Sequence, residues 1–411
     1  MKKKSRILSF ILAFLILLSS PNLVFSKVND ELLELEDYSQ ALLVANPETD
    51  EIYYSKNADK VLGIASMTKM MTYILVKEDL AQGKYKLQDL VKVDAEVAEY
   101  AEPGNSRMEL AEGEKISVEN LLAGLMVVSG NDAAVALAKK SAKTIKAFTE
   151  RMNAKAKELG LNDAYFINPT GLSEDVTKSG KKLTDFNRMS AMSLYKLAKY
   201  LVNNFPEVAD YSKLENLSMP KRNFLGDHTH DMYQSIPGLL GLKTGFTLEA
   251  MYNFTGYVDM NQFDKGQDYK LITVVTGADT AYVREKATRA LIQQVNDNYE
   301  YRDLLNYDLQ FPVVDFEARD TKEGTFPLYL EKPVRGVYPK GAKPEISYEI
   351  FEDKKAPFED GEALGQVTVS YEGRQLDKIN LVNKGYKPRL NFFSRLLASF
   401  KDLVRKLMLI F

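Results

Sequence analysis

The apolar positions change their periodicity along the chain, and the changes divide it into distinct stretches. From residue 38 to about residue 301, helical and strand-like patterns alternate. The methionine-rich segment 67–75 has apolar residues at i, i+3, i+4, i+7 and i+8, the spacing of one helix face. Strands predicted near both ends of this stretch indicate an α+β domain whose sheet joins the two ends. Further helices are expected at 121–126, 133–142, 147–159 and 281–295, and strands at 41–45, 51–55, 241–247, 251–258 and 269–276.

The helical periodicity disappears between about residues 306 and 384. Short strand candidates, such as 326–330 and 366–371, alternate there with Gly, Pro and Asp turns. This pattern is typical of a small all-β domain, and we expect a β-sandwich over residues 306–386.

The last stretch, 387–411, returns to helical spacing. Bulky apolar residues recur between 390 and 411, with four basic residues and a single acid, Asp402, between them. The basic residues argue against a membrane-spanning helix and favour an amphipathic helix that lies on an anionic membrane surface. A helix docked on the protein's own core is the alternative.

The first 26 residues form another separate segment. Four basic residues precede the apolar run 7–18, and the small residues Val24 and Ser26 stand at the −3 and −1 places of a cleavage site. We therefore predict a secretory signal peptide over residues 1–26, with a retained anchor helix as the alternative. With a signal peptide and an amphipathic helix over 387–411, we expect the protein to be exported and to lie at the outer face of the cytoplasmic membrane. Removal of the signal peptide takes the formal net charge from −3 to −7.

The composition excludes several classes of chemistry. The chain of 411 residues has no cysteine and two histidines, His228 and His230. Thiol catalysis and cysteine-based zinc sites are therefore excluded, and we expect neither a metal nor another cofactor. The acidic neighbours Asp227 and Asp231 favour a polar loop over a metal site around the two histidines. The net charge of −3 gives no indication of a nucleic-acid partner.

Three short motifs place a hydroxyl group beside an amine or an amide. If a helix begins at Ser66, the side chains of Ser66 and Lys69 lie on one face. A neutral Lys69 can then remove the proton that makes the Ser66 hydroxyl a poor nucleophile. Burial, or a second cation such as Lys243, would lower the pKa of Lys69. The motifs are Ser66-Met67-Thr68-Lys69, Ser129-Gly130-Asn131 and Lys243-Thr244-Gly245.

The second motif stands where one helical pattern ends and another begins. Gly130 is expected to permit the tight turn between them. Ser129 can relay a proton between an amine and a leaving group. Asn131 can hold Lys69 and a substrate amide.

The third motif lies on a predicted strand. Gly245 lets another backbone approach closely, and a peptide could pair along this strand by β-addition. Lys243, Thr244 and Thr247 could then bind a substrate carboxylate.

Each motif alone is common, but the three in this order resemble those of penicillin-binding proteins and class A β-lactamases. The surrounding stretches add to the resemblance, and over nearly its whole length the chain resembles a low-molecular-mass penicillin-binding protein. Such proteins are serine-type D-alanyl-D-alanine carboxypeptidases of peptidase family S11. The resemblance implies an α+β transpeptidase-like domain with helices packed on an antiparallel sheet (27–305), a small β-domain (306–386) and an anchoring helix (387–411). The stretches are 64–71, 127–134, 166–172 and 241–247.

The resemblance also implies roles for the motif residues. Ser66 would be the acylated nucleophile, Lys69 the general base and Ser129 the proton relay. The implied partners are peptidoglycan stem peptides, β-lactam antibiotics as acylating inhibitors, and the membrane surface. Substrate binding would fall to Asn131, Lys243, Thr244 and, nearby, Thr247.

The third motif is followed by two departures from the family. Ala250-Met251 stands where the family usually has Ala-Gly, and Lys270 is the counterpart expected for a carboxylate-binding arginine on the neighbouring strand.

Other functions stay open beside the carboxypeptidase. A β-lactamase is one, because Glu158 begins a Glu-x-x-Leu-Asn sequence; Lys155 and Lys157 beside it favour an exposed helix residue instead. A peptidoglycan endopeptidase and a non-catalytic envelope protein on the same fold are further alternatives. A zinc peptidase fits poorly with only two histidines.

Overall fold

The computed structural model describes residues 28–178, 181–230, 232–303, 312–318, 320–351, 353–371 and 373–394. The chain divides into two compact units, Lys27–Asn298 and Tyr299–Phe411, with residues 1–26 outside the first unit. The predicted domain boundary, 305/306, lies a few residues after the observed one. The predicted signal peptide and the predicted tail helix from Arg395 onward lie outside the described residues.

The first unit is built on a five-stranded antiparallel sheet with strand order β11-β12-β13-β1-β2. The early strand β1 pairs with the late strand β13, and Leu43 lies opposite Val274. The sheet therefore joins the two ends of the unit, as the sequence pattern predicts. Its strands are β1 (Ser39–Ala45), β2 (Ile52–Lys56), β11 (Leu239–Thr247), β12 (Met251–Asp259) and β13 (Lys270–Ala278).

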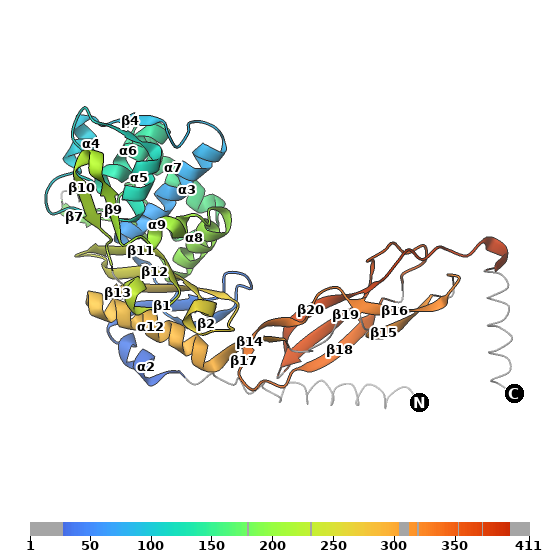
Figure 1. Ribbon diagram of the computed structural model, residues 1–411. Coiled ribbons are helices and arrows are strands. Elements are labelled where there is room, and N and C mark those ends of the chain that lie inside the picture. The colour runs from blue at the N-terminus through green and yellow to red at the C-terminus, as the bar shows by residue number, and fades with distance from the viewer. Residues whose placement is uncertain are drawn as a thin grey trace. The chain divides into compact units, whose positions relative to one another are not determined.

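Helices cover both faces of this sheet (Figure 1). The helices α2 (Asp30–Glu36) and α12 (Ala281–Asn298) pack on one face, and α8 (Ala191–Asn204) packs on the other. The remaining helices are short or belong to the helical region on the α8 side. They are α3 (Lys69–Ala81), α4 (Ala95–Glu99), α5 (Val118–Met126), α6 (Asn131–Ala142), α7 (Ile145–Glu158), α9 (Val208–Ser212), α10 (Met232–Ser235) and α11 (Met260–Phe263).

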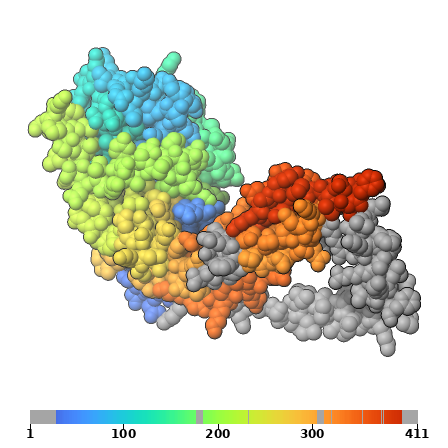
Figure 2. All heavy atoms as spheres, turned by 45° about the vertical axis from the view of Figure 1, so that its right-hand side comes forward, coloured from blue at the N-terminus to red at the C-terminus, as the bar shows by residue number. Residues whose placement is uncertain are grey.

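Short two-stranded ladders complete the unit. Between β9 and β10, the η2 turn (Pro220–Arg222) directs Arg222 to the backbone oxygens of Met108 and Glu109, each 3.1 Å away. In the space-filling view, yellow-green and blue segments of this unit adjoin on the surface (Figure 2). The ladders pair β3 (Leu62–Gly63) with β8 (Arg188–Met189), β4 (Leu90–Lys92) with β5 (Lys115–Ser117), β6 (Glu174–Lys178) with β7 (Lys181–Asp185), and β9 (Asn216–Met219) with β10 (Phe224–Asp227).

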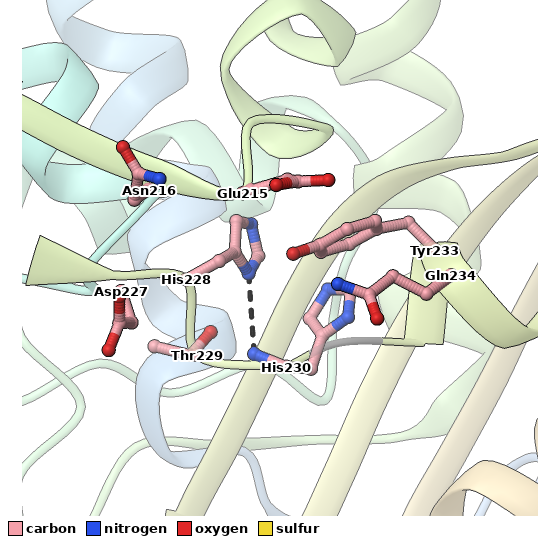
Figure 3. A pocket seen from close by; sticks show the side chains of 8 residues that line it. All are labelled: Glu215, Asn216, Asp227, His228, Thr229, His230, Tyr233 and Gln234. Atoms are coloured by element: carbon pink, nitrogen blue, oxygen red, sulfur yellow. Dashed lines mark hydrogen bonds between the residues drawn. The ribbon is translucent and has the colours of Figure 1, made fainter.

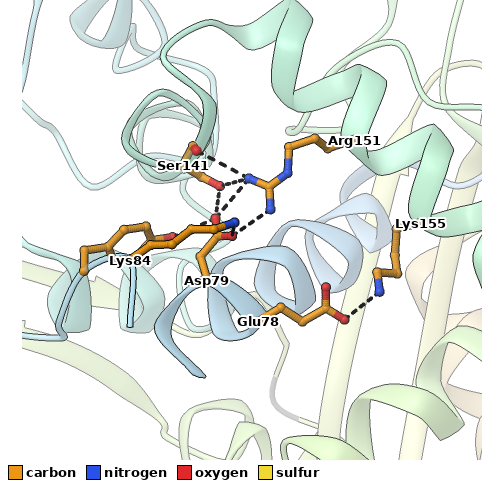
Figure 4. A network of polar contacts seen from close by, with 7 residues as sticks. Glu78, Asp79, Lys84, Ser141, Arg151 and Lys155 are labelled. Carbon is orange, nitrogen blue, oxygen red and sulfur yellow. Dashed lines mark hydrogen bonds and ion pairs between the residues drawn. The ribbon is translucent and has the colours of Figure 1, made fainter. Parts of the chain in front are cut away.

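Helix α3 runs through the middle of the helical region and is buried on nearly all sides. Its buried polar groups therefore need partners inside the protein. The Asp79 carboxylate, near the end of α3, accepts hydrogen bonds from Arg151 at 2.7 and 3.0 Å and from Lys84 at 2.6 Å. Ser141 also donates to it (Figure 4). This network ties α3 to α6 and α7.

The described residues of the second unit up to 383 form strands and turns, as predicted for the small β-domain. A five-stranded antiparallel sheet has the order β15-β16-β20-β19-β18, and β14 pairs separately with β17. Its core includes Phe316, Phe326 and Phe358, whose ring centroids lie 5.5–5.8 Å apart. The arrangement of this domain as a two-layered β-sandwich remains a prediction. The strands are β14 (Tyr299–Asp303), β15 (Val314–Ala318), β16 (Gly324–Leu330), β17 (Arg335–Pro339), β18 (Glu345–Ile350), β19 (Ala363–Tyr371) and β20 (Arg374–Asn383).

Within the described parts of the chain, no helix combines the length and the apolar character needed to cross a membrane.

Candidate active site

Ser66 is presented by a tight turn. Residues Ala65–Thr68 form a 3₁₀-helix, η1, and the α-helix itself begins at Lys69, so the predicted α-helical start at Ser66 is three residues too early. The helical offset still brings the two side chains together, because Lys69 Nζ lies 2.9 Å from Ser66 Oγ. The backbone just before the nucleophile is unusual, since Ala65 has a φ of +44°.

Lys69 is fully buried, and its hydrogen-bonding partners are uncharged. Its Nζ lies 2.8 Å from Asn131 Oδ1 and 2.7 Å from the backbone oxygen of Thr170. Burial and, secondarily, the charge of Lys243 hold the pKa of Lys69 well below its usual range, against the opposing charge of Asp132. A neutral amine has two N–H groups and one lone pair. When Asn131 and Thr170 accept both N–H groups, the lone pair faces the Ser66 hydroxyl.

The Thr170 carbonyl is part of a turn to which the sequence analysis gave no role. Asn168 Oδ1 accepts hydrogen bonds from the backbone N–H groups of Thr170 at 3.2 Å and Gly171 at 2.8 Å. Gly171 has a φ of +88°, and a Cβ there would lie 2.0 Å from the Ala65 oxygen. The Asn-Pro-Thr-Gly sequence of residues 168–171 is a turn signal that could have pointed to this structure.

A buried asparagine on another segment fastens this turn to the nucleophile's helix. Asn187 Nδ2 donates to Thr68 Oγ1 at 2.8 Å and to the backbone oxygen of Asn168 at 2.9 Å. Nothing in the local sequence distinguishes Asn187, because its two partners come from distant segments.

The second motif joins α5 to α6, as predicted, but the strained backbone is at a different residue. Ser129 has a φ of +58°, whereas Gly130 has a φ of −54°. Gly130 is needed for space: a Cβ there would lie 2.9 Å from Asp132 Oδ1 and 3.2 Å from Met108 Cγ. The Ser129 hydroxyl is buried and has no hydrogen-bond partner among the described residues. A strained residue with an unpaired buried hydroxyl is typical of a functional site.

Asp132, beside the motif, is an anchor that the sequence analysis missed. Its carboxylate accepts hydrogen bonds from the N–H groups of Met108 at 2.9 Å, Leu110 at 3.1 Å and Ala133 at 2.8 Å. Burial nevertheless raises its pKa. These bonds hold the segment 106–110 against the start of α6, where the Asn131 N–H also donates to the Ser106 oxygen at 2.8 Å.

The third motif lies on strand β11, as predicted, directly beside Ser66. A Cβ on Gly245 would lie 2.6 Å from the Ile64 oxygen and 3.1 Å from Ser66 N, so only glycine allows this close approach. Among the described strands, β11 pairs only with β12, so it is the edge of the sheet.

The side chains of this motif differ in their surroundings. Lys243 is buried, and burial together with the charge of Arg284 lowers its pKa to about 7. Thr244 Oγ1 lies 2.8 Å from Thr229 Oγ1. Thr247 Oγ1 accepts a hydrogen bond from Ala250 N at 3.1 Å, so in this structure it stabilises the β11–β12 turn.

The two histidines lie in the loop after β10, but they are more buried than a polar loop implies. They border a pocket of about 430 Å³, next to Thr229 (Figure 3). The His230 N–H donates to His228 Nδ1 at 3.3 Å, and burial lowers the pKa of His228 to about 4 and that of His230 to about 2. In the described part of the chain, no group of three or more His, Cys, Asp or Glu side chains is placed to hold a metal ion.

The expectation that Lys270 replaces a carboxylate-binding arginine is wrong. Lys243 lies opposite Thr255, which lies opposite Val274 on β13. Lys270 is four residues further along that strand, about 13 Å away at 3.3 Å per residue. The buried cation whose charge acts on Lys243 is Arg284 of α12.

The other residues singled out beside the site also have a structural account. Met251 has a φ of +58°, which explains why a glycine is the ordinary residue at such a position. Glu158 pairs with Lys155 at 2.7 Å and its side chain is 65% exposed, in agreement with an exposed helix residue.

Comparisons with known proteins agree with this geometry. Residues 29–280 match the family model for D-alanyl-D-alanine carboxypeptidase, and residues 299–386 match that for the C-terminal domain of penicillin-binding protein 5. The chain is 29% identical over 403 residues to the D-alanyl-D-alanine carboxypeptidase DacF of Bacillus subtilis (strain 168). That alignment covers 97% of this chain and 98% of the relative.

Solved structures give the same result. A peptidoglycan synthesis regulatory factor (PBP3) from Streptococcus pneumoniae superposes with a TM-score of 0.70 at 26% identity, over 85% of this chain and 99% of its own. Penicillin-binding protein D2 from Listeria monocytogenes, solved in its ampicillin-bound form, gives a TM-score of 0.53 at 29% identity, over 62% of this chain and 96% of its own. With its three motifs gathered around Ser66 and a family model matching more than half of its length, the chain belongs to the D-alanyl-D-alanine carboxypeptidase family.

Proposed function

We propose that this enzyme removes the terminal D-alanine from peptidoglycan pentapeptide stems through an acyl-enzyme on Ser66. The observation that carries the proposal is the environment of Lys69. Its amine lies 2.9 Å from Ser66 Oγ, its pKa is lowered by burial, and its other two contacts are uncharged oxygens. This is the arrangement that a general base for a serine nucleophile requires.

Acylation follows from these positions. Lys69 takes the Ser66 proton as Oγ attacks the carbonyl carbon of the penultimate D-alanine. The C–N bond to the terminal D-alanine then breaks, and its amine takes up a proton through Ser129, whose buried hydroxyl lacks a partner among the described residues. Water attacks the resulting ester, releasing the shortened stem and returning Ser66 to its hydroxyl form.

Strand β11 supports substrate binding beside the nucleophile. Its free edge allows an extended peptide to pair along it by β-addition. Lys243 and Thr244 would bind the terminal carboxylate, and Asn131 would hold both Lys69 and the substrate amide. A β-lactam antibiotic carries a carboxylate and a reactive amide in one molecule, so it would acylate the same serine.

Mass spectrometry of the purified protein, incubated with a soluble pentapeptide or with a penicillin, tests the proposal. We expect a penicillin adduct on Ser66 and release of D-alanine from the peptide. Ser66→Ala should lose both, and Ser347→Ala, an exposed serine of β18, should keep both. Rapid penicillin hydrolysis without D-alanine release would instead identify a β-lactamase. Failure of labelled penicillin to acylate the protein would indicate a non-catalytic role.

We further propose that the protein is exported and held at the outer face of the cytoplasmic membrane by its C-terminal helix. The proposal rests on two sequence features, the basic and apolar segment 1–26 and the basic amphipathic segment 390–411. Residues 1–26 and 395–411 lie outside the described residues. Deleting residues 390–411 should release the protein from membranes while soluble activity remains. Unchanged membrane association would refute this role for the tail.

A further inference from the structure

The turn between β11 and β12 presents apolar side chains to solvent beside the active site. Phe246 is 49% exposed and Leu248 is 83% exposed. The Phe246 ring packs on Tyr252, its partner across the hairpin, with 4.4 Å between ring centroids. Large apolar groups gathered at an exposed position indicate a binding surface more often than isolated ones do.

The register of β11 shows which part of a substrate would reach these side chains. The proposed carboxylate site is at Lys243 and Thr244, and Gly245 lies against the backbone of Ser66. The scissile bond is therefore level with Gly245, and the acyl part of the peptide continues toward Phe246. At about 3.3 Å per residue, the residue before the terminal D-Ala-D-Ala lies level with 247–248.

A carboxylate stands next to this apolar surface. Glu249 is exposed at the turn, and Ser173 Oγ donates to its Oε2 at 2.6 Å. That hydrogen bond lowers the pKa of Glu249, so its charge is present at neutral pH. The bond also ties the carboxylate of the β11–β12 turn to the segment that carries Ser173.

We propose that Phe246, Leu248 and Glu249 form a subsite for a stem residue whose long aliphatic side chain ends in an ammonium group. The inference rests on the proposed carboxypeptidase activity and names the residue that precedes the terminal D-Ala-D-Ala. The methylene groups pack on Phe246 and Leu248, and the ammonium pairs with Glu249. A diamino acid that carries an additional carboxylate at the end of its side chain is disfavoured by the same charge.

Three peptides that share the D-Ala-D-Ala end test the subsite. They carry Nα-acetyl-lysine, Nα,Nε-diacetyl-lysine or Nα-acetyl-alanine at the preceding position. We expect kcat/KM for the free ammonium to exceed that for the acetylated side chain by about twofold to fivefold, the range of an exposed ion pair. We expect the alanyl peptide to be about tenfold poorer than the acetylated lysyl peptide, because its side chain leaves the apolar surface uncovered.

Single substitutions show which residue causes each difference in kcat/KM between the peptides. Glu249→Gln should bring the ratio between the free and acetylated lysyl peptides to about 1, and Glu150→Gln, an exposed glutamate of α7, should keep it. Leu248→Ala should reduce the ratio between the acetylated lysyl and alanyl peptides, mainly through KM. Leu33→Ala, an exposed leucine on α2, should keep that ratio.

The possible outcomes separate the two proposals. No D-alanine release from any of the three peptides would overturn the proposed function itself. D-alanine release with equal kcat/KM for all three would leave the carboxypeptidase in place and overturn the subsite. If the Glu249→Gln variant still prefers the free ammonium over the acetylated side chain, Glu249 is not part of the subsite.

Discussion

Two lysines share this buried site, and their surroundings give them different chemistry. Lys69 contacts two uncharged oxygens and the Ser66 hydroxyl. Asp132, the acid whose charge acts on Lys69, is engaged by three backbone N–H groups. Lys243 has a pKa of about 7, lowered by burial and by Arg284. Burial therefore holds the pKa of the first lysine well below its usual range, and the second titrates near pH 7.

This difference predicts how substrate binding depends on pH. An amine with a pKa of about 7 is charged below pH 7 and loses its proton above it. We expect KM for a D-Ala-D-Ala peptide to rise as pH increases from 7 to 9, because Lys243 loses the charge that attracts the carboxylate. In Lys243→Arg the guanidinium stays charged over this range, so the alkaline rise in KM should disappear. A pH profile of KM and kcat for both proteins is the measurement.

A peptide whose terminal carboxylate is amidated provides the control. Its KM should be high and nearly independent of pH, since it has no charge for Lys243 to recognise. If the carboxylate and amide peptides show the same pH dependence, a group other than Lys243 titrates.

At the level of the elements, periodicity predicted much of the fold. The helices and strands that border the three motifs lie where the apolar spacing places them, and the offset of three between Ser66 and Lys69 brings those side chains together. The finer geometry did not follow from local patterns. The positive φ is at Ser129, and Gly130 is needed because Asp132 and Met108 leave too little room for a Cβ there. Part of that constraint comes from Met108, which is distant in sequence.

The same reason explains the residues that were missed or wrongly assigned. The Thr170 oxygen and Asn187 act through contacts between distant segments, which a single sequence does not reveal. Lys270 was assigned to the site from its strand alone, and the strand register places it elsewhere. Arg284 was overlooked because it acts from a helix on the other face of the sheet.

Helix α3 carries Lys69, the proposed general base, at one end and the Asp79 network at the other. Burial acts to raise the pKa of Asp79, but hydrogen bonds from Arg151, Lys84 and Ser141 outweigh it, and the pKa stays below its usual value. We expect Asp79→Asn to lower the free energy of unfolding by about 3 kcal/mol, because it breaks a buried ion pair. Urea unfolding measures this change.

Asp59→Asn, at an exposed position, is the matched control and should change the free energy of unfolding by less than about 0.5 kcal/mol. Equal stabilities of the two variants would show that the network contributes nothing to holding α3.

At the scale of the whole molecule, each compact unit has a core of its own. Buried side chains from α3, α5, α6 and α8 form the core of the first unit, and Phe316, Phe326 and Phe358 belong to that of the second. Every residue of the proposed active site comes from the first unit. Units with separate cores are able to unfold separately, in which case a single transition does not describe the chain.

Phe358→Ala tests this separation. Removing a fully buried phenylalanine should destabilise the second unit by about 3–5 kcal/mol and lower the temperature of one calorimetric transition. The rate of acylation by labelled penicillin should stay unchanged, because no site residue belongs to that unit. Phe148→Ala, an equally buried phenylalanine of α7, should lower the other transition instead. One transition that moves in both variants, with slower acylation in Phe358→Ala, would show that the two cores unfold as one.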